Sequence, residues 1–230
     1  MMQANCRFFS TIDRVGRNAC VAFLILLGSG CAVTPPKVDP YSTLLPAGRK
    51  VVDGTASFSA ASLKQETAYL VVGANFVTYI DVWNKFQKSA ERGGNIVYSK
   101  AFMLEILAQW SPARTTALVA TGLQKHFRNV VAVDDLAEAQ AKSAKWIVMF
   151  DHAFVQTSTA TATWTNSTSI DLLDSTFRRV VAAAFSEHRD YGAAWGDGDV
   201  QRFSKYRGED VLRTVKAAIA QFDAKLAVPR

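Results

Sequence analysis

The sequence predicts an α/β two-layer sandwich, in which a mixed and largely antiparallel sheet carries helices packed on one face. Two observations lead to this class. Segments of β-branched and aromatic residues alternate along the chain with segments of helical periodicity, and the last helical segment has the clearest apolar stripe. The 230 residues are 49% apolar and 20% charged, a composition that supports one domain with a full hydrophobic core.

The first predicted elements are two strands and a helix. Residues 69–83 are rich in β-branched and aromatic side chains, which predict a strand with a bulge at Gly73. Residues 96–110 fit both a strand, which we favour, and one face of a helix. Ser111 and Pro112 combine a capping residue with a proline at the first helical position, so a helix is predicted from Pro112 to about residue 127.

The middle of the chain predicts two further strands and a small helix. Residues 130–133 form a short apolar run typical of a strand. Asp134 and Asp135 precede an alanine-rich segment that predicts a helix to about residue 143. Residues 146–155 are apolar on both faces, which favours a central strand of the sheet.

The C-terminal part predicts a hairpin and a long helix. Residues 169–173 and 179–185 are strand-like and flank a cluster of turn residues; a helix over 175–188 is the competing interpretation. Residues 193–207 predict a loop. Residues 209–228 carry one continuous apolar stripe and predict the closing helix.

A threonine-rich segment predicts a β-ribbon with one polar face. From residue 157 to residue 165, threonine occupies the odd positions, whereas alanine and Trp164 occupy even positions. No lysine or proline in this segment protects the strand from edge pairing. An unprotected edge invites a partner strand, unless a neighbouring strand of the same domain covers it. The candidate partner-binding residues in this ribbon are Thr157, Thr159, Thr161 and Thr163.

Residues 1–30 predict a signal peptide. Three arginines and one aspartate precede the nine-residue apolar run 19–27, and small residues follow it directly. Ser29-Gly30-Cys31 resembles the end of the lipobox of bacterial lipoproteins, in which the cysteine is acylated and becomes the first residue after cleavage. Gly28 stands where that motif prefers leucine. Cleavage after Ala32 as an ordinary signal peptide and an uncleaved anchor are the alternatives.

Cysteine usage supports lipid attachment at Cys31. All three cysteines lie within the first 31 residues, so the mature chain keeps a single thiol, which the lipid uses. Three acyl chains on that residue would hold the protein firmly on a bilayer. The absence of aspartate after Cys31 resembles the enterobacterial sorting signal for the outer membrane, with the protein on the periplasmic side.

The mature chain predicts a tether followed by one domain. Residues 31–48 are proline-rich and predict an extended tether, and residues 49–230 predict a single periplasmic domain. The whole sequence has a net charge of +6, to which the signal peptide contributes its excess of arginine. The modest positive charge that remains on the mature chain favours anionic lipid head groups or cell-wall polymer, and not nucleic acid, as a partner.

Several short features resemble a known group of lipoproteins. They are the cysteine for lipid attachment, a helix opened by Trp110-Ser111-Pro112, a step from Phe127 to Val130, a strand that starts Ala144-Lys145-Trp146-Ile147, a hairpin near Asp174 and an alanine-rich closing helix. Together they resemble the auxiliary lipoproteins of ABC-type lipid-transport systems. Lipoproteins that activate cell-wall synthases and the N-terminal domain of the Tol–Pal translocation protein look similar. The likeness covers residues 96–228 and implies an accessory role in the cell envelope.

The sequence contains no recognised catalytic motif. G-x-S-x-G, H-E-x-x-H, C-x-x-C and P-loop patterns are absent and the three histidines are far apart, so we expect no enzyme activity, no metal site and no cofactor. Asp151 and His152 are neighbours in a predicted strand. Their side chains should therefore point to opposite faces, which excludes a direct acid–base dyad.

The leading hypothesis is a non-enzymatic, outer-membrane-anchored lipoprotein that serves envelope maintenance or lipid transport by binding an envelope protein or a phospholipid. Arg202, Lys205 and Arg207 alternate with aromatic residues and are further candidates for partner binding; a solvated loop is the simpler interpretation. The alternative function is an activator or docking module for an envelope enzyme such as a cell-wall synthase. A hydrolase is the least supported class.

Overall fold

The computed structural model describes residues 37–45, 50–55, 58–93, 100–109, 111–158, 163–190 and 197–227. Within them, one five-stranded sheet has the strand order β2-β1-β3-β4-β5. The strands are β1 (Thr67–Val72), β2 (Asn129–Ala132), β3 (Trp146–Ser158), β4 (Thr163–Asp174) and β5 (Arg179–Asp190). The helices are α2 (Ala60–Leu63), α3 (Ala74–Glu91), α4 (Lys100–Gln109), α5 (Pro112–Leu123), α6 (Leu136–Ala141) and α7 (Asp197–Leu226). The predicted α/β fold with a mixed sheet is confirmed.

The sheet has a short parallel part and a long antiparallel part. β1 pairs in parallel with β2 and β3, while β3, β4 and β5 form an antiparallel meander. β1 has 6 residues and β3 has 13, and the pairing of β1 ends opposite Phe150. The meander therefore extends well beyond the parallel strands.

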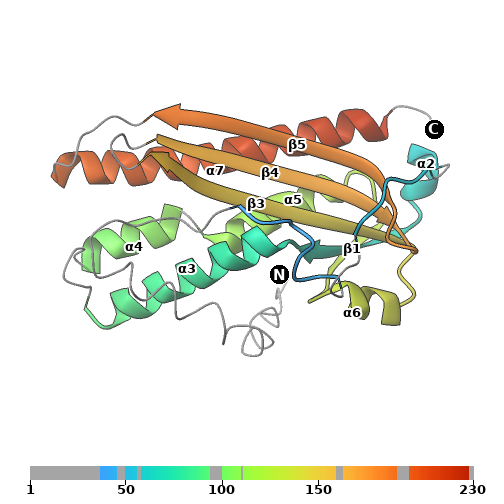
Figure 1. Ribbon diagram of the computed structural model, residues 1–230, viewed down its shortest axis with the longest axis horizontal. Coiled ribbons are helices and arrows are strands. Elements are labelled where there is room, and N and C mark those ends of the chain that lie inside the picture. Colours follow the sequence, from blue (N-terminus) through green and yellow to red (C-terminus); the bar gives the residue numbers. More distant parts are fainter. Residues whose placement is uncertain are drawn as a thin grey trace. The chain divides into compact units, whose positions relative to one another are not determined.

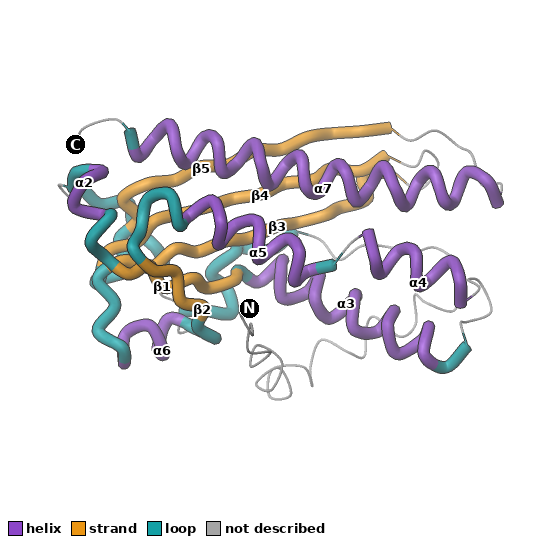
Figure 2. The backbone as a smooth tube through the Cα atoms, turned by 180° about the vertical axis from the view of Figure 1, so that it is seen from behind, coloured by secondary structure: helices purple, strands orange, loops and turns teal. Residues whose placement is uncertain are grey.

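The two faces of the sheet are covered unequally by helices. Helices α3, α4, α5 and α7 lie on one face (Figure 2), whereas α6 lies on the other. The right-handed crossover rule explains the difference. The connection from β1 to β2 runs outward along the sheet, and the connection from β2 to β3 runs back across β1, so their helices must lie on opposite faces.

The main core lies between the sheet and the larger helix layer. The rings of Phe76 on α3 and Phe150 on β3 are both fully buried, with centroids 4.9 Å apart. Helix α5 approaches α7 closely at Gly122, where a Cβ atom would lie 2.9 Å from Cγ2 of Ile219. The other large buried side chains of this layer include Leu70, Val119, Leu123, Val148, Ile170, Leu172, Val215 and Phe222.

The predicted strand over 69–83 is wrong beyond Val72. The chain leaves β1 there and, after Gly73, enters the 18-residue helix α3. The β-branched and aromatic residues of this segment favour a strand by propensity, but Phe76 and Ile80, one helical turn apart, bury the same face against the sheet. Tertiary packing overrides the local preference.

Two further predictions are corrected at the helix layer. The favoured strand over 96–110 is wrong for residues 100–109, which form α4, so the helical alternative is correct. The predicted loop over 193–207 is wrong from Asp197 onward, because α7 begins there. A 30-residue helix spans about 45 Å, which matches the length of the meander strands, so α7 follows β4 and β5 over their full length (Figure 1).

The remaining predicted elements are confirmed. Ser111 caps α5 by accepting a hydrogen bond from the backbone N–H of Arg114, Asp135 caps α6 in the same way, and β3 is a central strand. The predicted hairpin is also present, with β4 and β5 joined by a turn in which Phe177 has a φ of 62°. The competing helix over 175–188 is therefore wrong.

Candidate functional site

The sheet face opposite the long helices is only partly covered (Figure 1). At its parallel end, α6 packs over a cluster of apolar side chains, which includes Val71, Leu136, Ala139, Ile147, Met149 and Leu173. Further along β4 and β5, the same face presents small and polar side chains to solvent. We call this second area the open face and define it by Thr165, Ser167 and Ser169 on β4, paired with His188, Ser186 and Ala184 on β5.

Cross-strand hydrogen bonds connect the polar side chains of the open face. The hydroxyl oxygens of Ser167 and Ser186 lie 3.0 Å apart, and the hydroxyl of Thr165 lies 3.0 Å from Nδ1 of His188. Such a pattern is typical of an antiparallel sheet with one solvated face. The small side chains make this surface low in relief.

An N-terminal segment, residues 37–45, is fastened beside the open face, and we call it the docked segment. The side-chain amide of Asn75 accepts a hydrogen bond from the Val38 N–H at 2.8 Å and donates one to the Val38 carbonyl at 2.9 Å. The N–H of Ala74 donates to the Pro40 carbonyl at 2.9 Å. The predicted tether, residues 31–48, differs from this arrangement, because its described part from Lys37 is packed against the domain.

Asp151 joins the docked segment, β3 and the first turn of α3. Gly73, the residue before α3, has no side chain with which to cap the helix. The Asp151 carboxylate takes the role of the cap: it accepts hydrogen bonds from the backbone N–H of Phe76 at 3.0 Å and from the side-chain amide of Asn75 at 2.7 Å. A Cβ atom at Gly73 would lie 2.6 Å from Oδ1 of Asp151. Burial raises the pKa of Asp151, while these hydrogen bonds oppose the rise.

Tyr41 anchors the other end of the docked segment. Its hydroxyl donates a 2.6 Å hydrogen bond to Asp171, and the Arg179 guanidinium lies 3.6 Å from the same carboxylate. Burial raises the pKa of Asp171, and the hydrogen bond from Tyr41 and the positive charge of Arg179 oppose the rise. Burial and the neighbouring Asp171 charge raise the pKa of Tyr41 as well. Arg179 also donates to Asp53 at 2.7 Å, which holds the pKa of that exposed carboxyl low.

A hollow of about 460 Å³ lies between the docked segment and the open face. Its floor is formed by the serines and alanines of β4 and β5, with Tyr41 and Arg179 beside them. Lys37 and Lys50 line it and are exposed, and neither amine forms a hydrogen bond or an ion pair with another described residue. The hollow is therefore a mainly apolar surface depression, in which the positive charges of Lys37, Lys50 and Arg179 are matched by the carboxyl groups of Asp39, Asp151 and Asp171.

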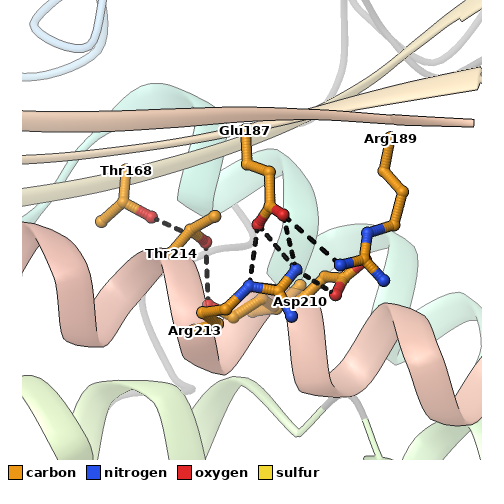
Figure 3. Close-up of polar contacts among 7 residues, drawn as sticks. Thr168, Glu187, Arg189, Asp210, Arg213 and Thr214 are labelled. Atoms are coloured by element: carbon orange, nitrogen blue, oxygen red, sulfur yellow. Dashed lines mark hydrogen bonds and ion pairs between the residues drawn. The ribbon is translucent and has the colours of Figure 1, made fainter.

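On the opposite face, an ionic network fastens α7 to β5 (Figure 3). Arg213 of α7 donates two hydrogen bonds to the Glu187 carboxylate of β5, from Nε at 3.0 Å and from Nη2 at 2.7 Å. The same Nη2 also donates to Asp210 at 2.5 Å. Arg189 of β5 reaches the buried Asp210 at 3.3 Å. Two cations face two anions at this contact, so the network stabilises the position of the long helix.

His152 lies on this helix-covered face, while Asp151 lies on the other, as predicted for neighbours in a strand. The hydroxyl of Thr214 donates to the Val211 carbonyl at 2.9 Å, and the hydroxyl of Thr168 donates to Thr214 at 3.4 Å. Nδ1 of His152 lies 2.9 Å from the Thr168 hydroxyl, and the tautomer of the imidazole decides which group donates this hydrogen bond. Complete burial lowers the pKa of His152 to about 4, so this imidazole is neutral at pH 7.

The structure separates the candidate partner-binding residues named from the sequence. Thr157 lies at the end of β3. Arg202, Lys205 and Arg207 belong to α7, but their side chains lie outside the described part of the structure. Cys31, Thr159 and Thr161 lie outside the described residues. Thr163 begins β4, which lies between β3 and β5 and leaves this threonine 8% exposed. The predicted unprotected edge is therefore wrong for β4, and coverage by neighbouring strands of the same domain is the correct alternative.

Most of the groups that surround the hollow have no local signal in the sequence. Tyr41 stands in a segment whose prolines predict an extended chain, and Asn75 stands in a segment that resembles a strand. Asp171 is one of many carboxylates in the chain. The large apolar residues of the predicted tether, Tyr41, Leu44 and Leu45, were the available hint, since an extended linker has no use for large apolar side chains.

The arrangement is suited to holding and binding, because its buried acids are engaged in the fold. Asp151 caps α3 and Asp171 accepts from Tyr41, so neither is directed at the hollow as an unpartnered acid or base. Within the described ranges, no three His, Cys, Asp or Glu side chains converge as metal ligands. No helix in that same part of the chain is long and apolar enough to cross a bilayer.

Comparisons with known proteins give only distant structural likenesses. No protein-family profile and no curated protein matches this sequence. Similar solved structures include the PelC dodecamer from Paraburkholderia phytofirmans, with 12% identity over 71% of this chain and 93% of that one and a TM-score of 0.32. Protein XCC0632 from Xanthomonas campestris has 9% identity over 76% and 95% of the two chains and a TM-score of 0.30. Lipoprotein GNA1162 from Neisseria meningitidis has 12% identity over 64% and 99% and a TM-score of 0.23. Similarities at this level determine neither the family nor the activity of the chain.

Proposed function

We propose that the mature chain is a lipoprotein, attached through Cys31 to the periplasmic side of the outer membrane, and that it works as a non-enzymatic accessory of envelope maintenance or lipid transport. The observation that carries the proposal is the sequence around Cys31. A basic segment, a nine-residue apolar run and Ser29-Gly30 precede this cysteine, and the 199 residues after it contain no other cysteine.

The domain supports an accessory role in two ways. Its buried polar groups around the hollow, Asp151 and Asp171 among them, are used to hold the docked segment, which leaves the hydroxyls and amines of the rim for binding. The fold also begins close to Cys31, since Lys37 is already packed at the hollow. An anchored domain with an accessible hollow is suited to a docking role.

Metabolic labelling with palmitate tests the attachment. We expect the wild-type chain to incorporate label and to lose its signal peptide, and Cys31→Ser to do neither. Cys20→Ser, which lies in the apolar run, is the matched control and should still be labelled and processed. Equal labelling of wild type and Cys31→Ser would contradict the proposal.

Partner capture distinguishes the two accessory roles. Affinity purification from a detergent-solubilised envelope should recover a transporter permease or substrate-binding component if the protein serves lipid transport. Recovery of a cell-wall synthase would favour the alternative role as an activator. Substitution of Arg202, Lys205 and Arg207 together by glutamine tests whether this cationic stretch of α7 takes part; undiminished capture would exclude it.

A further inference from the structure

We propose that the open face of the sheet is turned toward the bilayer that carries the lipid anchor, and that Lys37 and Lys50 contact its anionic head groups. The inference rests on the proposed lipidation of Cys31. It adds an orientation and a contact surface to that proposal. Three observations carry it, namely the short covalent link, the fixed place at which the link enters the fold, and the chemistry of the surface around that place.

The link is short. Only residues 32–36 separate Cys31 from Lys37, so the two Cα atoms can be at most about 20 Å apart even in a fully extended chain. The strands of the meander are about 40 Å long. The anchor is therefore held within half a strand length of the docked segment.

The link enters the fold on the side of the open face. Val38 is held by Asn75, Pro40 accepts from the first turn of α3, and Tyr41 is bonded to Asp171, all beside the hollow. A helix is about 10 Å across and packs about 10 Å from a sheet, so the two layers together are about 20 Å thick. A 20 Å link cannot cross this thickness and also pass round the sheet edge. The short link therefore favours an orientation in which the layer of α3, α5 and α7 faces away from the membrane.

The chemistry of the exposed surface suits an anionic bilayer. Lys37 and Lys50 are exposed at the hollow; the charge of Lys37 also acts on the Asp151 carboxyl, and Lys50 forms no hydrogen bond or ion pair with another described residue. Among the nearby acids, Asp151 and Asp171 are 2% and 4% exposed and Asp53 is paired with Arg179, whereas the exposed Asp39 lines the same hollow and accepts a hydrogen bond from the Tyr41 N–H at 3.0 Å. The open face itself carries serine, threonine and alanine, with His188 as its one larger side chain. Lysines near an anionic membrane are attracted to it, each strengthening contact about fivefold.

The test places one fluorescent label on either side of the domain. The full lipidated chain is inserted into vesicles of phosphatidylethanolamine and phosphatidylglycerol that carry a nitroxide quencher on the head group. Ser186→Cys labels the open face, and Ala220→Cys labels the exposed side of α7 as the matched control. The Cys31 sulfur is occupied by the lipid and does not react with the label. We expect at least about twofold stronger quenching at position 186, because the two labels lie about 20 Å apart across the layers.

Two further variants separate the parts of the argument. Twelve glycine and serine residues inserted after Thr34 should reduce the difference in quenching between the two labels, since the longer link permits more orientations and leaves only the lysine contacts to favour one of them. Lys37→Gln with Lys50→Gln should reduce the quenching at position 186, whereas Lys216→Gln on α7 should not. Circular dichroism and thermal melting verify that each variant is folded.

The outcomes distinguish this inference from the proposed function. Equal quenching at the two positions in a chain that carries palmitate would overturn the orientation and leave the lipoprotein assignment intact. Quenching that does not change in the double lysine variant would overturn the head-group contact. Absence of palmitate at Cys31 would overturn the proposed function, and with it the orientation.

Discussion

Replacing His152 by leucine should remove a specific pH dependence of stability. The imidazole is fully buried and its pKa is lowered from the usual 6.5 to about 4. Between these values the unfolded chain binds a proton that the folded chain does not. The stabilisation from this group is therefore complete above pH 6.5 and is lost as the pH falls toward 4. At about 1.4 kcal/mol per pH unit, the loss amounts to about 3 kcal/mol.

Urea unfolding of wild type and His152→Leu between pH 7 and pH 4 measures this effect. Burial raises the pKa of Asp81, Asp151 and Asp171, so these carboxyls favour the folded state as the pH falls, but they are present in both proteins and cancel in the difference. At pH 7 the variant should be less stable by about 1 kcal/mol, because it loses the hydrogen bond to Thr168. At pH 4 the variant should be the more stable protein.

His188→Leu is the matched control, since this imidazole is exposed on β5. Thr168 keeps its own donation to Thr214 in the His152 variant, so the substitution leaves no hydroxyl proton without an acceptor. A difference in stability between wild type and His152→Leu that is the same at pH 7 and pH 4 would refute the reasoning. It would mean that the imidazole takes up a proton equally in the folded and unfolded chains.

Three further predictions concern the contacts that hold the domain together. Tyr41→Phe removes the 2.6 Å hydrogen bond to the buried Asp171 and should lower the free energy of unfolding by about 1.5–3 kcal/mol; unchanged stability in chemical denaturation would contradict the assigned contact. Gly73→Ala should cost about 1–2 kcal/mol, because the added Cβ would displace the Asp151 cap of α3, and an unaltered Tm would exclude this role. Asp210→Asn should cost about 1–3 kcal/mol through its two arginine partners. Because the Asp210 side chain is 1% exposed, salt should screen this cost little, and unchanged stability of the variant would argue against the ion pairs.

Local sequence signals were sufficient for elements that are determined by their own residues. Ser111 and Pro112 define the start of α5 because the cap and the fixed φ of proline act within one turn. The apolar residues of β3 occupy both faces, which indicates a central strand without knowledge of its neighbours. Turn residues between two β-prone segments were enough to predict the β4–β5 hairpin.

Elements that depend on distant partners were predicted wrongly. Helix α3 follows Gly73 and contains many β-prone residues, and its cap comes from Asp151, 78 positions later in the chain. The first ten residues of α7 contain Gly198 and Asp199 and resemble a loop, but the helix begins at Asp197 and extends past the ends of the meander strands (Figure 1). No local pattern reports a cap or a packing surface that another part of the chain supplies.

The sequence by itself determined the class of fold, because composition and periodicity are properties of neighbouring residues. Only the tertiary structure decided that residues 37–45 belong to the domain and that Tyr41, Asn75, Asp151 and Asp171 meet beside the open face. These groups come from an N-terminal segment, a helix and two strands. Hydrogen bonds between such separated segments form only when the sheet brings them together, so the docked segment follows from packing and not from any local preference.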